Sequence, residues 1–210
     1  MQFDLLDSTH NQILSQAGYE AFAKALRESN CQRCPLAQSR SRIVVDRGNP
    51  LSKVMIISER PGDNEDKTGL AFVGRAGELL DKIFAAIGMD TNKDLLIVNV
   101  VKCLPPTDRA PQSNEVEACR PYLEKQIDLV QPKVIILLGA VAFKYVSGQP
   151  RDFSMEEEAG KFFTLPKFPG IQFMVLYHPA FLLRDPSKKK LMWLHVQRLK
   201  EYLQNSKLLP

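Results

Sequence analysis

Four cysteines are the residues whose type and spacing point most directly to chemistry. They are Cys31, Cys34, Cys103 and Cys119, and two residues separate the first pair, a spacing that lets two thiolates share one metal. A single four-thiolate site uses all four. The alternative is two disulfides, but CxxC pairs are strained as structural disulfides, and intracellular thiols stay reduced. Thiolate ligands favour zinc or an iron–sulfur cluster, and the spacing leaves that choice open.

A second set of polar residues accompanies short apolar runs. The segment 58–66 (Ser-Glu-Arg-Pro-Gly-Asp-Asn-Glu-Asp) follows one run, Asn99 lies within another, and His178 follows a third. An Asn inside an apolar run costs free energy unless it has a partner or a ligand. Ligands collect beyond the carboxyl ends of parallel strands, so we expect the three segments to face one crevice. Taken singly, each has a simpler explanation as a solvated turn, a satisfied polar group or a helix cap.

The loop 69–77 places an aromatic residue between glycines, ahead of an expected helix. Its Phe72 has the flat side chain needed to stack on a planar ligand, and the amides at the start of the helix can meet a phosphate. Simple burial of Phe72 explains the same residues equally well.

The elements that must position these residues alternate between strand and helix. Runs of branched apolar residues predict buried parallel strands, and stripes at helical spacing predict amphipathic helices. An α/β fold follows, a three-layer α/β/α sandwich formed by one domain over residues 1–210. The segment 148–169 is predicted to be irregular, without chemistry. The expected strands are 54–57, 95–101, 134–138 and 173–177, and the expected helices are 11–29, 79–87, 116–130 and 187–203.

Bulk composition narrows the class of protein. The chain has 210 residues, 44% of them hydrophobic, and a net charge of +4, which permits a polyanion partner without requiring one. Its apolar stretches fall short of the roughly 20 residues that span a bilayer, and it begins with a polar segment rather than a signal sequence. We expect a soluble cytoplasmic protein with no membrane partner, and a monomer by default.

Taken together, these residues resemble the family 4 uracil-DNA glycosylases, the iron–sulfur branch of the uracil-DNA glycosylase superfamily. The resemblance covers nearly the whole chain and rests on six matches in order. These are the Cys31/Cys34 pair, Glu59-x-Pro61-Gly62 with its acidic tail, Phe72-Val73-Gly74-Arg75-Ala76-Gly77, Asn99-Val100-Val101-Lys102-Cys103-Leu104-Pro105-Pro106, Cys119, and His178-Pro179-Ala180-x-x-Leu183-Arg184.

The resemblance implies a fold, a cofactor and an activity. The fold is an α/β sandwich around a four-stranded parallel sheet. The cofactor is a structural [4Fe–4S] cluster on Cys31, Cys34, Cys103 and Cys119. The activity is hydrolysis of the bond between uracil and deoxyribose in single- or double-stranded DNA, which leaves an abasic site for base excision repair.

The resemblance also implies roles for individual residues. His178 donates a hydrogen bond to uracil O2, and Asn99 reads the O4 and N3–H edge. Glu59 is the third catalytic candidate, and which group orients the attacking water stays open. Phe72 stacks on the flipped base, and the acidic Glu65 near C5 excludes the methyl group of thymine. The complete uracil-binding set is Glu59, Arg60, Pro61, Gly62, Glu65, Phe72, Asn99 and His178, and the DNA-contact candidates are Arg109, Arg184 and Lys188.

Some positions depart from the family pattern. Ser58 replaces a usual Gly and Arg60 a usual small residue, while Leu104 and Asp108 remove an Arg and an Asn from a loop expected to approach DNA. Two alternatives therefore remain open beside the enzyme. One is a non-catalytic iron–sulfur DNA-binding paralogue, and the other is a zinc-stapled nucleic-acid module without a base pocket.

Overall fold

The computed structural model describes residues 2–148 and 153–209, with side chains from residue 8 onward. A mixed sheet with strand order β1-β3-β2-β4-β6-β5 forms the middle layer. The four inner strands are mutually parallel, as predicted, and a short antiparallel strand pairs with each outer one. Over the described residues, the expected four-stranded sheet is therefore corrected to six strands. The strands are β1 (Arg47–Gly48), β2 (Val54–Ser58), β3 (Leu96–Asn99), β4 (Val134–Leu138), β5 (Phe162–Thr164) and β6 (Gln172–Leu176).

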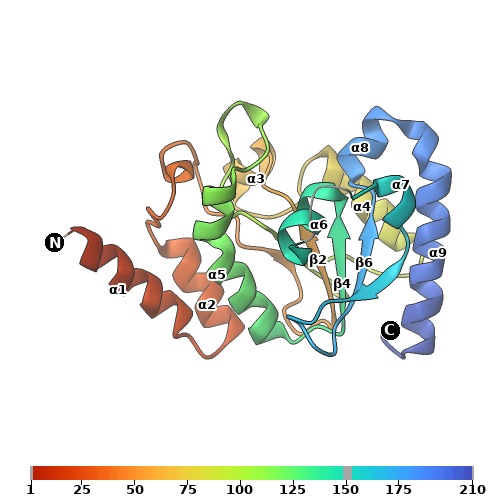
Figure 1. Ribbon diagram of the computed structural model, residues 1–210, viewed down its shortest axis with the longest axis horizontal. Coiled ribbons are helices and arrows are strands. Elements are labelled where there is room, and N and C mark those ends of the chain that lie inside the picture. Colours follow the sequence, from red (N-terminus) through yellow and green to blue (C-terminus); the bar gives the residue numbers. More distant parts are fainter. Residues whose placement is uncertain (1, 149–152, 210) are drawn as a thin grey trace.

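Helices cover both faces of the sheet, which gives the three layers that the alternating pattern predicts (Figure 1). In the view of Figure 1, α1, α2 and α5 lie on one side of the sheet, and α4 and α9 lie on the other. The α-helices are α1 (Gln2–Leu14), α2 (Tyr19–Glu28), α3 (Asp63–Thr68), α4 (Arg75–Ala85), α5 (Ser113–Val130), α6 (Gly139–Ser147), α7 (Met155–Glu158), α8 (Pro179–Arg184) and α9 (Lys189–Asn205). The short 3₁₀ helices of the described residues are η1 (Pro35–Gln38), η2 (Pro106–Asp108) and η3 (Pro186–Lys188).

The strand sequences explain why the sheet has a hydrophobic core on each of its two faces. Every residue of β2, β3 and β4 is buried, because the branched side chains alternate between two helical layers. Met55 and Ile57 enter the core beneath α2 and α5, whereas Val54 and Ile56 enter the core beneath α4 and α9. This two-sided burial fixes the strand register and brings the strand ends to one edge of the sheet.

Two sequence predictions of secondary structure are wrong. The expected single helix over 11–29 is two helices, because α1 ends at Leu14 and Gly18 caps the start of α2. The segment 148–169, expected to be irregular, contains α7 and the edge strand β5. Residues 149–152 of that segment lie outside the described part of the chain.

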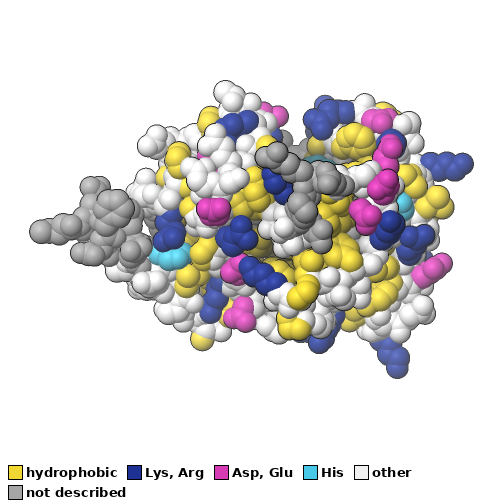
Figure 2. All heavy atoms as spheres, in the orientation of Figure 1, with side chains coloured by type: hydrophobic (Ala, Val, Ile, Leu, Met, Phe, Trp, Pro, Cys, Tyr) yellow, Lys and Arg dark blue, Asp and Glu magenta, His cyan; other side chains and the backbone are white. Residues whose placement is uncertain are grey.

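The surface is mixed in charge. Figure 2 shows Lys and Arg side chains scattered over the visible face and interspersed with acidic ones, rather than gathered in one patch. Among the described residues, no helix is both long and apolar enough to cross a membrane. Charge on this face does not by itself mark a functional site.

Candidate active site

A cavity of about 570 Å³ opens where the carboxyl ends of β2, β3 and β6 meet the N-terminal ends of α6 and α8. The three polar segments expected to face one crevice do so. Seven of the eight residues predicted to bind uracil line this cavity, and Pro61 does not. The seven are Glu59, Arg60, Gly62, Glu65, Phe72, Asn99 and His178.

Asn99 is the most informative residue of the cavity. It ends β3, is 1% exposed, and its side-chain Nδ2 and Oδ1 have no hydrogen-bond partner among the described residues. Buried amides are nearly always paired, because an unpaired one forfeits its bonds to water without replacement. The Asn99 carboxamide therefore presents one free donor and one free acceptor to whatever enters the cavity.

A polar network beneath the cavity fixes the backbone of Asn99. The Nζ of fully buried Lys102 donates to the main-chain oxygen of Asn99 at 2.6 Å and to Oε1 of Gln126 at 2.5 Å. Gln126 in turn donates from Nε2 to the hydroxyl of Tyr19 and to the main-chain oxygen of Val45. These bonds run from the end of β3 through α5 to α2, so the strand end is held by side chains outside the cavity.

His178 is held as a neutral imidazole in one tautomer. The main-chain N–H of Ala180 donates to Nδ1 at 3.1 Å, so the ring proton of the neutral form resides on Nε2, 2.9 Å from Oγ of Ser58. Burial, with the positive charges of Arg60 and Arg184, lowers the pKa of His178 to about 4. The side chain is thus a hydrogen-bond donor without a positive charge at neutral pH.

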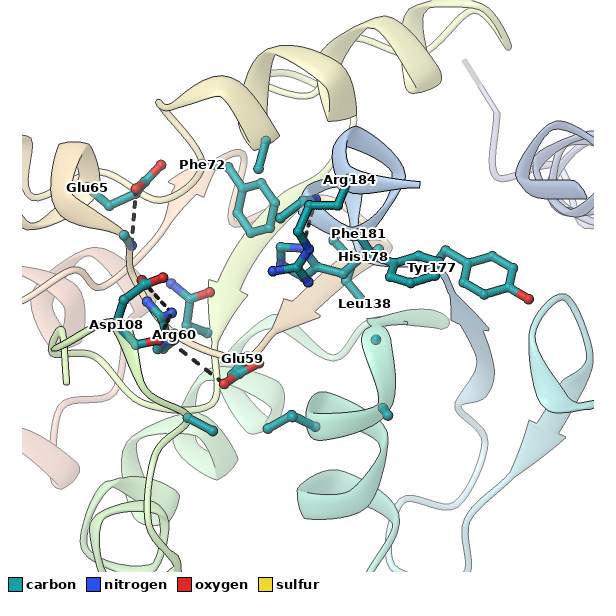
Figure 3. Close-up of a pocket in the computed structure, with 18 of the residues that line it drawn as sticks. Glu59, Arg60, Glu65, Phe72, Asp108, Leu138, Tyr177, His178, Phe181 and Arg184 are labelled. Atoms are coloured by element: carbon teal, nitrogen blue, oxygen red, sulfur yellow. Dashed lines mark hydrogen bonds and ion pairs between the residues drawn. The ribbon is translucent and has the colours of Figure 1, made fainter. Parts of the chain in front are cut away.

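Phe72 lies beside His178 and has a strained backbone conformation. Its φ is 55°, and its ring centroid lies 5.7 Å from that of His178, with the ring planes tilted by 38° (Figure 3). A side chain at Gly77 would collide with the carbonyl of Phe72, at 1.8 Å from its oxygen, and Arg47 donates to that same oxygen at 2.7 Å. The surroundings therefore hold the backbone in the left-handed region that residues other than glycine rarely adopt.

Glu65 connects two walls of the cavity. Its carboxylate accepts hydrogen bonds from the main-chain N–H of Gly62 at 3.1 Å and from those of Val73 and Gly74 at 2.8 Å each. The side chain lines the cavity, as its expected place near uracil C5 requires. Because its oxygens already accept hydrogen bonds from backbone amides, Glu65 also holds the turn after β2 (residues 59–62) against the loop that carries Phe72.

Arg60 connects the turn after β2 (residues 59–62) to the loop after β3. Its Nη2 bonds the Asp108 carboxylate at 2.6 Å and the Asp108 carbonyl at 2.8 Å, and its Nη1 donates to the carbonyl of Pro61 (Figure 3). The carboxylate of Glu59 lies 3.9 Å from Nε of Arg60. Burial raises the pKa of Glu59, while Arg60 lowers it and Asp108 raises it. A carboxylate with a raised pKa, close to a cation, suits the handling of a proton.

The three DNA-contact candidates lie in different surroundings. Arg184 lines the cavity, where Figure 3 shows it beside His178. Arg109 forms a two-pronged ion pair with buried Glu115, at 2.8 and 2.6 Å, and Lys188 pairs with Glu156 at 2.5 Å. Arg184 is therefore the cation of this set that faces a prospective ligand, whereas the other two are already paired.

Sequence reasoning missed several residues of the cavity. Tyr177 and Phe181 stack at 5.7 Å between ring centroids, and the segment from Leu138 to Val141 forms another wall. Gly139 directly follows β4, so the rule that ligands gather at strand ends could have found that segment. Met155 comes from the stretch that was predicted to carry no chemistry, and nothing in its local sequence marks it.

The four cysteines line a separate small pocket of about 20 Å³. All four are free thiols. Burial raises the pKa of Cys103, and raises that of Cys119 to about 11, so both thiols stay protonated unless a metal replaces the proton. Among the described residues, no three His, Cys, Asp or Glu side chains are placed to hold a single metal ion.

A family model and several known proteins are similar to this chain. The sequence model of the uracil DNA glycosylase superfamily matches residues 45–201. A type-4 uracil-DNA glycosylase of Sulfurisphaera tokodaii is 38% identical, with 82% of this chain and 80% of that protein covered. Proteins of the same description from Pyrobaculum aerophilum and Thermotoga maritima are 40% and 38% identical. The match to the former covers 75% of this chain and 82% of the relative, and that to the latter covers 78% and 83%.

Proposed function

Because this chain belongs to the uracil DNA glycosylase superfamily, we propose that it hydrolyses the N-glycosidic bond of uracil in DNA. The products are free uracil and an abasic site, so the enzyme acts in base excision repair. The observation that carries this proposal is the pair of unpaired amide atoms of buried Asn99, in one cavity with the neutral His178. The Asn99 carboxamide can form hydrogen bonds to the edge of a base, and the N–H group of His178 can stabilise a developing negative charge.

Recognition follows from the donor and acceptor of Asn99. Nδ2 donates to uracil O4 while Oδ1 accepts from N3–H, and cytosine presents the opposite arrangement at both positions. The base must leave the DNA stack to reach this site, and the ring of Phe72 provides a surface for stacking in exchange. Thymine differs from uracil only by the C5 methyl group, which the wall containing Glu65 is proposed to exclude.

Catalysis in this proposal is mainly electrostatic. As the bond between C1′ of the sugar and N1 of uracil breaks, its electrons move to uracil and negative charge grows on O2. The Nε2–H of His178 donates to O2, and the positive charge of Arg184 lies on the same side of the cavity. A neutral imidazole is the better donor here because it carries no positive charge that must be buried in the free protein.

Glu59 is the proposed partner of the attacking water. Water forms a bond to C1′ as the bond to uracil breaks, and its proton must be accepted nearby. The Glu59 carboxylate lines the cavity, and its raised pKa brings it closer to that of a general base working at neutral pH. Arg60 is ion-paired to Asp108 at the edge of this site, so its contribution to uracil binding is proposed to come from its backbone.

The proposed cofactor is a [4Fe–4S] cluster held by Cys31, Cys34, Cys103 and Cys119. Four thiols around one pocket fit it in type and number. When bound, the cluster supplies a structural crosslink between the segment after α2, the loop after β3 and α5.

Iron analysis tests this cofactor separately from activity. We expect brown protein that contains about four iron and four sulfide per chain. Replacement of Cys119 by Ser should remove most of the colour, while a colourless preparation with stoichiometric zinc contradicts the proposal. The partner is proposed to be uracil-containing DNA, single- or double-stranded, bound by a monomeric, single-domain protein in the cytoplasm, with Arg184 as the leading phosphate contact.

The activity itself is tested with a labelled oligonucleotide that contains one uracil. After incubation, alkali should cleave the strand at that position, and matched oligonucleotides with thymine or cytosine should stay intact. His178→Ala should slow the reaction by about 10²- to 10³-fold. Absence of cleavage by wild-type protein with its full metal content contradicts the proposal and favours a non-catalytic paralogue. Arg60→Ala then decides whether the Asp108-bound arginine blocks the site.

A further inference from the structure

Ser58 lies between the two residues proposed to read uracil. It is the last residue of β2, it is fully buried, and it pairs in register with Asn99 at the end of the neighbouring strand β3. Its Oγ is 2.9 Å from Nε2 of His178, which follows β6. Ser58 itself is absent from the cavity lining, so its hydroxyl reaches a ligand only through its effect on His178.

The direction of this hydrogen bond is fixed by the other ring nitrogen. The main chain of Ala180 donates to Nδ1, so Nδ1 carries the lone pair and Nε2 carries the single proton of the neutral ring. The hydroxyl oxygen of Ser58 is therefore the acceptor. His178 has one N–H group, and in the free protein Ser58 already binds it.

We propose that Ser58 is a positioning residue that holds the Nε2–H of His178 in the free protein, and that uracil O2 has to take this hydrogen bond over. The inference rests on the proposed function and goes beyond it, because it assigns the resting partner of the catalytic donor. The exchange has a cost, because the fully buried hydroxyl of Ser58 gives up its hydrogen bond to His178. Uracil bears that cost on binding, since it competes with an acceptor already in place.

Competition of this kind has a characteristic kinetic effect. Since the His178 bond to O2 is present in the bound ground state and in the transition state, removing the competitor strengthens both equally. Ser58→Ala should tighten the binding of free uracil and lower KM for uracil-containing DNA, each by roughly fivefold, the scale of one neutral hydrogen bond. A purely structural role for Ser58 predicts the reverse, because loss of a buried hydrogen bond loosens the site.

The experiment measures free-uracil affinity and KM for wild type, Ser58→Ala and Ser58→Gly. A matched control is Ser52→Ala, which removes another buried serine hydroxyl at the opposite end of β2, where Ser52 bonds the main-chain oxygens of Val54 and Asp94. The control should change the unfolding free energy but not uracil affinity. In a His178→Ala background, the effect of Ser58→Ala should disappear, as a double-mutant cycle requires for a residue that acts through His178.

A second readout does not depend on glycosylase activity. In wild-type protein labelled with ¹⁵N histidine, the Nε2–H proton of His178 should give a signal protected from exchange with water, and Ser58→Ala should speed that exchange. Unchanged or weaker uracil binding in both Ser58 variants, with wild type active, overturns this inference alone. Absence of uracil binding and excision by wild type overturns the proposed function and this inference together, while the exchange measurement still tests the contact.

Discussion

Two buried carboxamides lie on either side of Lys102 and differ in one respect. Gln126 uses both ends of its amide, accepting from Lys102 and donating to Tyr19 and Val45. Asn99 is just as buried, yet its side-chain amide has no partner among the described residues. The same chain pairs one amide completely and leaves the other unpaired at a cavity, so the unpaired one marks where a ligand supplies the missing bonds.

Removal of the unpaired amide should have the largest effect on function and almost none on stability. Asn99→Ala takes away both proposed contacts to uracil, and we expect kcat/KM for uracil excision to fall by about 10²- to 10³-fold. No side-chain hydrogen bond of Asn99 is lost, so urea unfolding should give a free energy equal to or above that of wild type. A large drop in stability would mean that the amide has a structural partner after all.

Removal of the paired amide should give the opposite result. Gln126→Leu leaves Lys102, Tyr19 and Val45 each short of a hydrogen bond, and we expect a loss of about 3 kcal/mol in unfolding free energy. Where the variant remains folded, excision should stay within about tenfold of wild type, because Lys102 still binds the main chain of Asn99. If activity falls while stability holds, the contrast between the two amides is wrong.

A change at Glu65, in the wall of the cavity, should affect both the stability of the protein and its KM for uracil-containing DNA. Glu65→Gln puts an NH₂ group where the carboxylate now accepts from three main-chain N–H groups, so Gly62 and the Phe72 loop lose part of their attachment. We expect unfolding free energy to fall by about 1–2 kcal/mol and KM to rise several-fold. Glu78→Gln, a change to another acidic side chain on the neighbouring helix α4, is the control. Equal effects in the two variants would remove the special role of Glu65.

Acid should destabilise the protein partly through His178. Its folded-state pKa of about 4 lies below the unfolded value of roughly 6.5, so between these pH values the unfolded chain binds a proton that the folded protein does not. Unfolding free energy should therefore fall as pH decreases from 7 towards 4. His178→Gln should show a shallower fall over that window and the same behaviour as wild type above pH 7. Identical slopes in both proteins would show that the buried imidazole is not held neutral.

The features of the fold and the site that depend on local sequence patterns could be predicted from the sequence. The branched runs at 54–57 and 134–138 are apolar on both faces because both faces are buried, and this property is visible without a structure. Asn99 and His178 stand out because each breaks or ends such a run. From that, the three layers, the parallel inner strands and the meeting of polar segments at one cavity could all be expected.

What could not be predicted depends on contacts distant in the sequence. The ion pairs of Arg109 with Glu115 and of Lys188 with Glu156 are contacts that the sequence does not reveal. The contact between Ser58 and His178 joins positions that are 120 residues apart, and no spacing rule reveals it. The edge strand β5 has only three residues, and it forms because β6 offers it a partner rather than through its own pattern.

The central claim is that the unpaired side-chain amide of Asn99 forms its hydrogen bonds with uracil. The NMR signals of the Asn99 side-chain NH₂ group test this claim most directly. In ¹⁵N-labelled protein, titration with free uracil should shift these two proton signals until the site is saturated, while the NH₂ signals of Gln126 stay in place. Cytosine should leave both sets unchanged, because its donor and acceptor pattern is reversed at this edge. Asn99 signals that do not move with uracil, or that move equally with cytosine, would contradict the account.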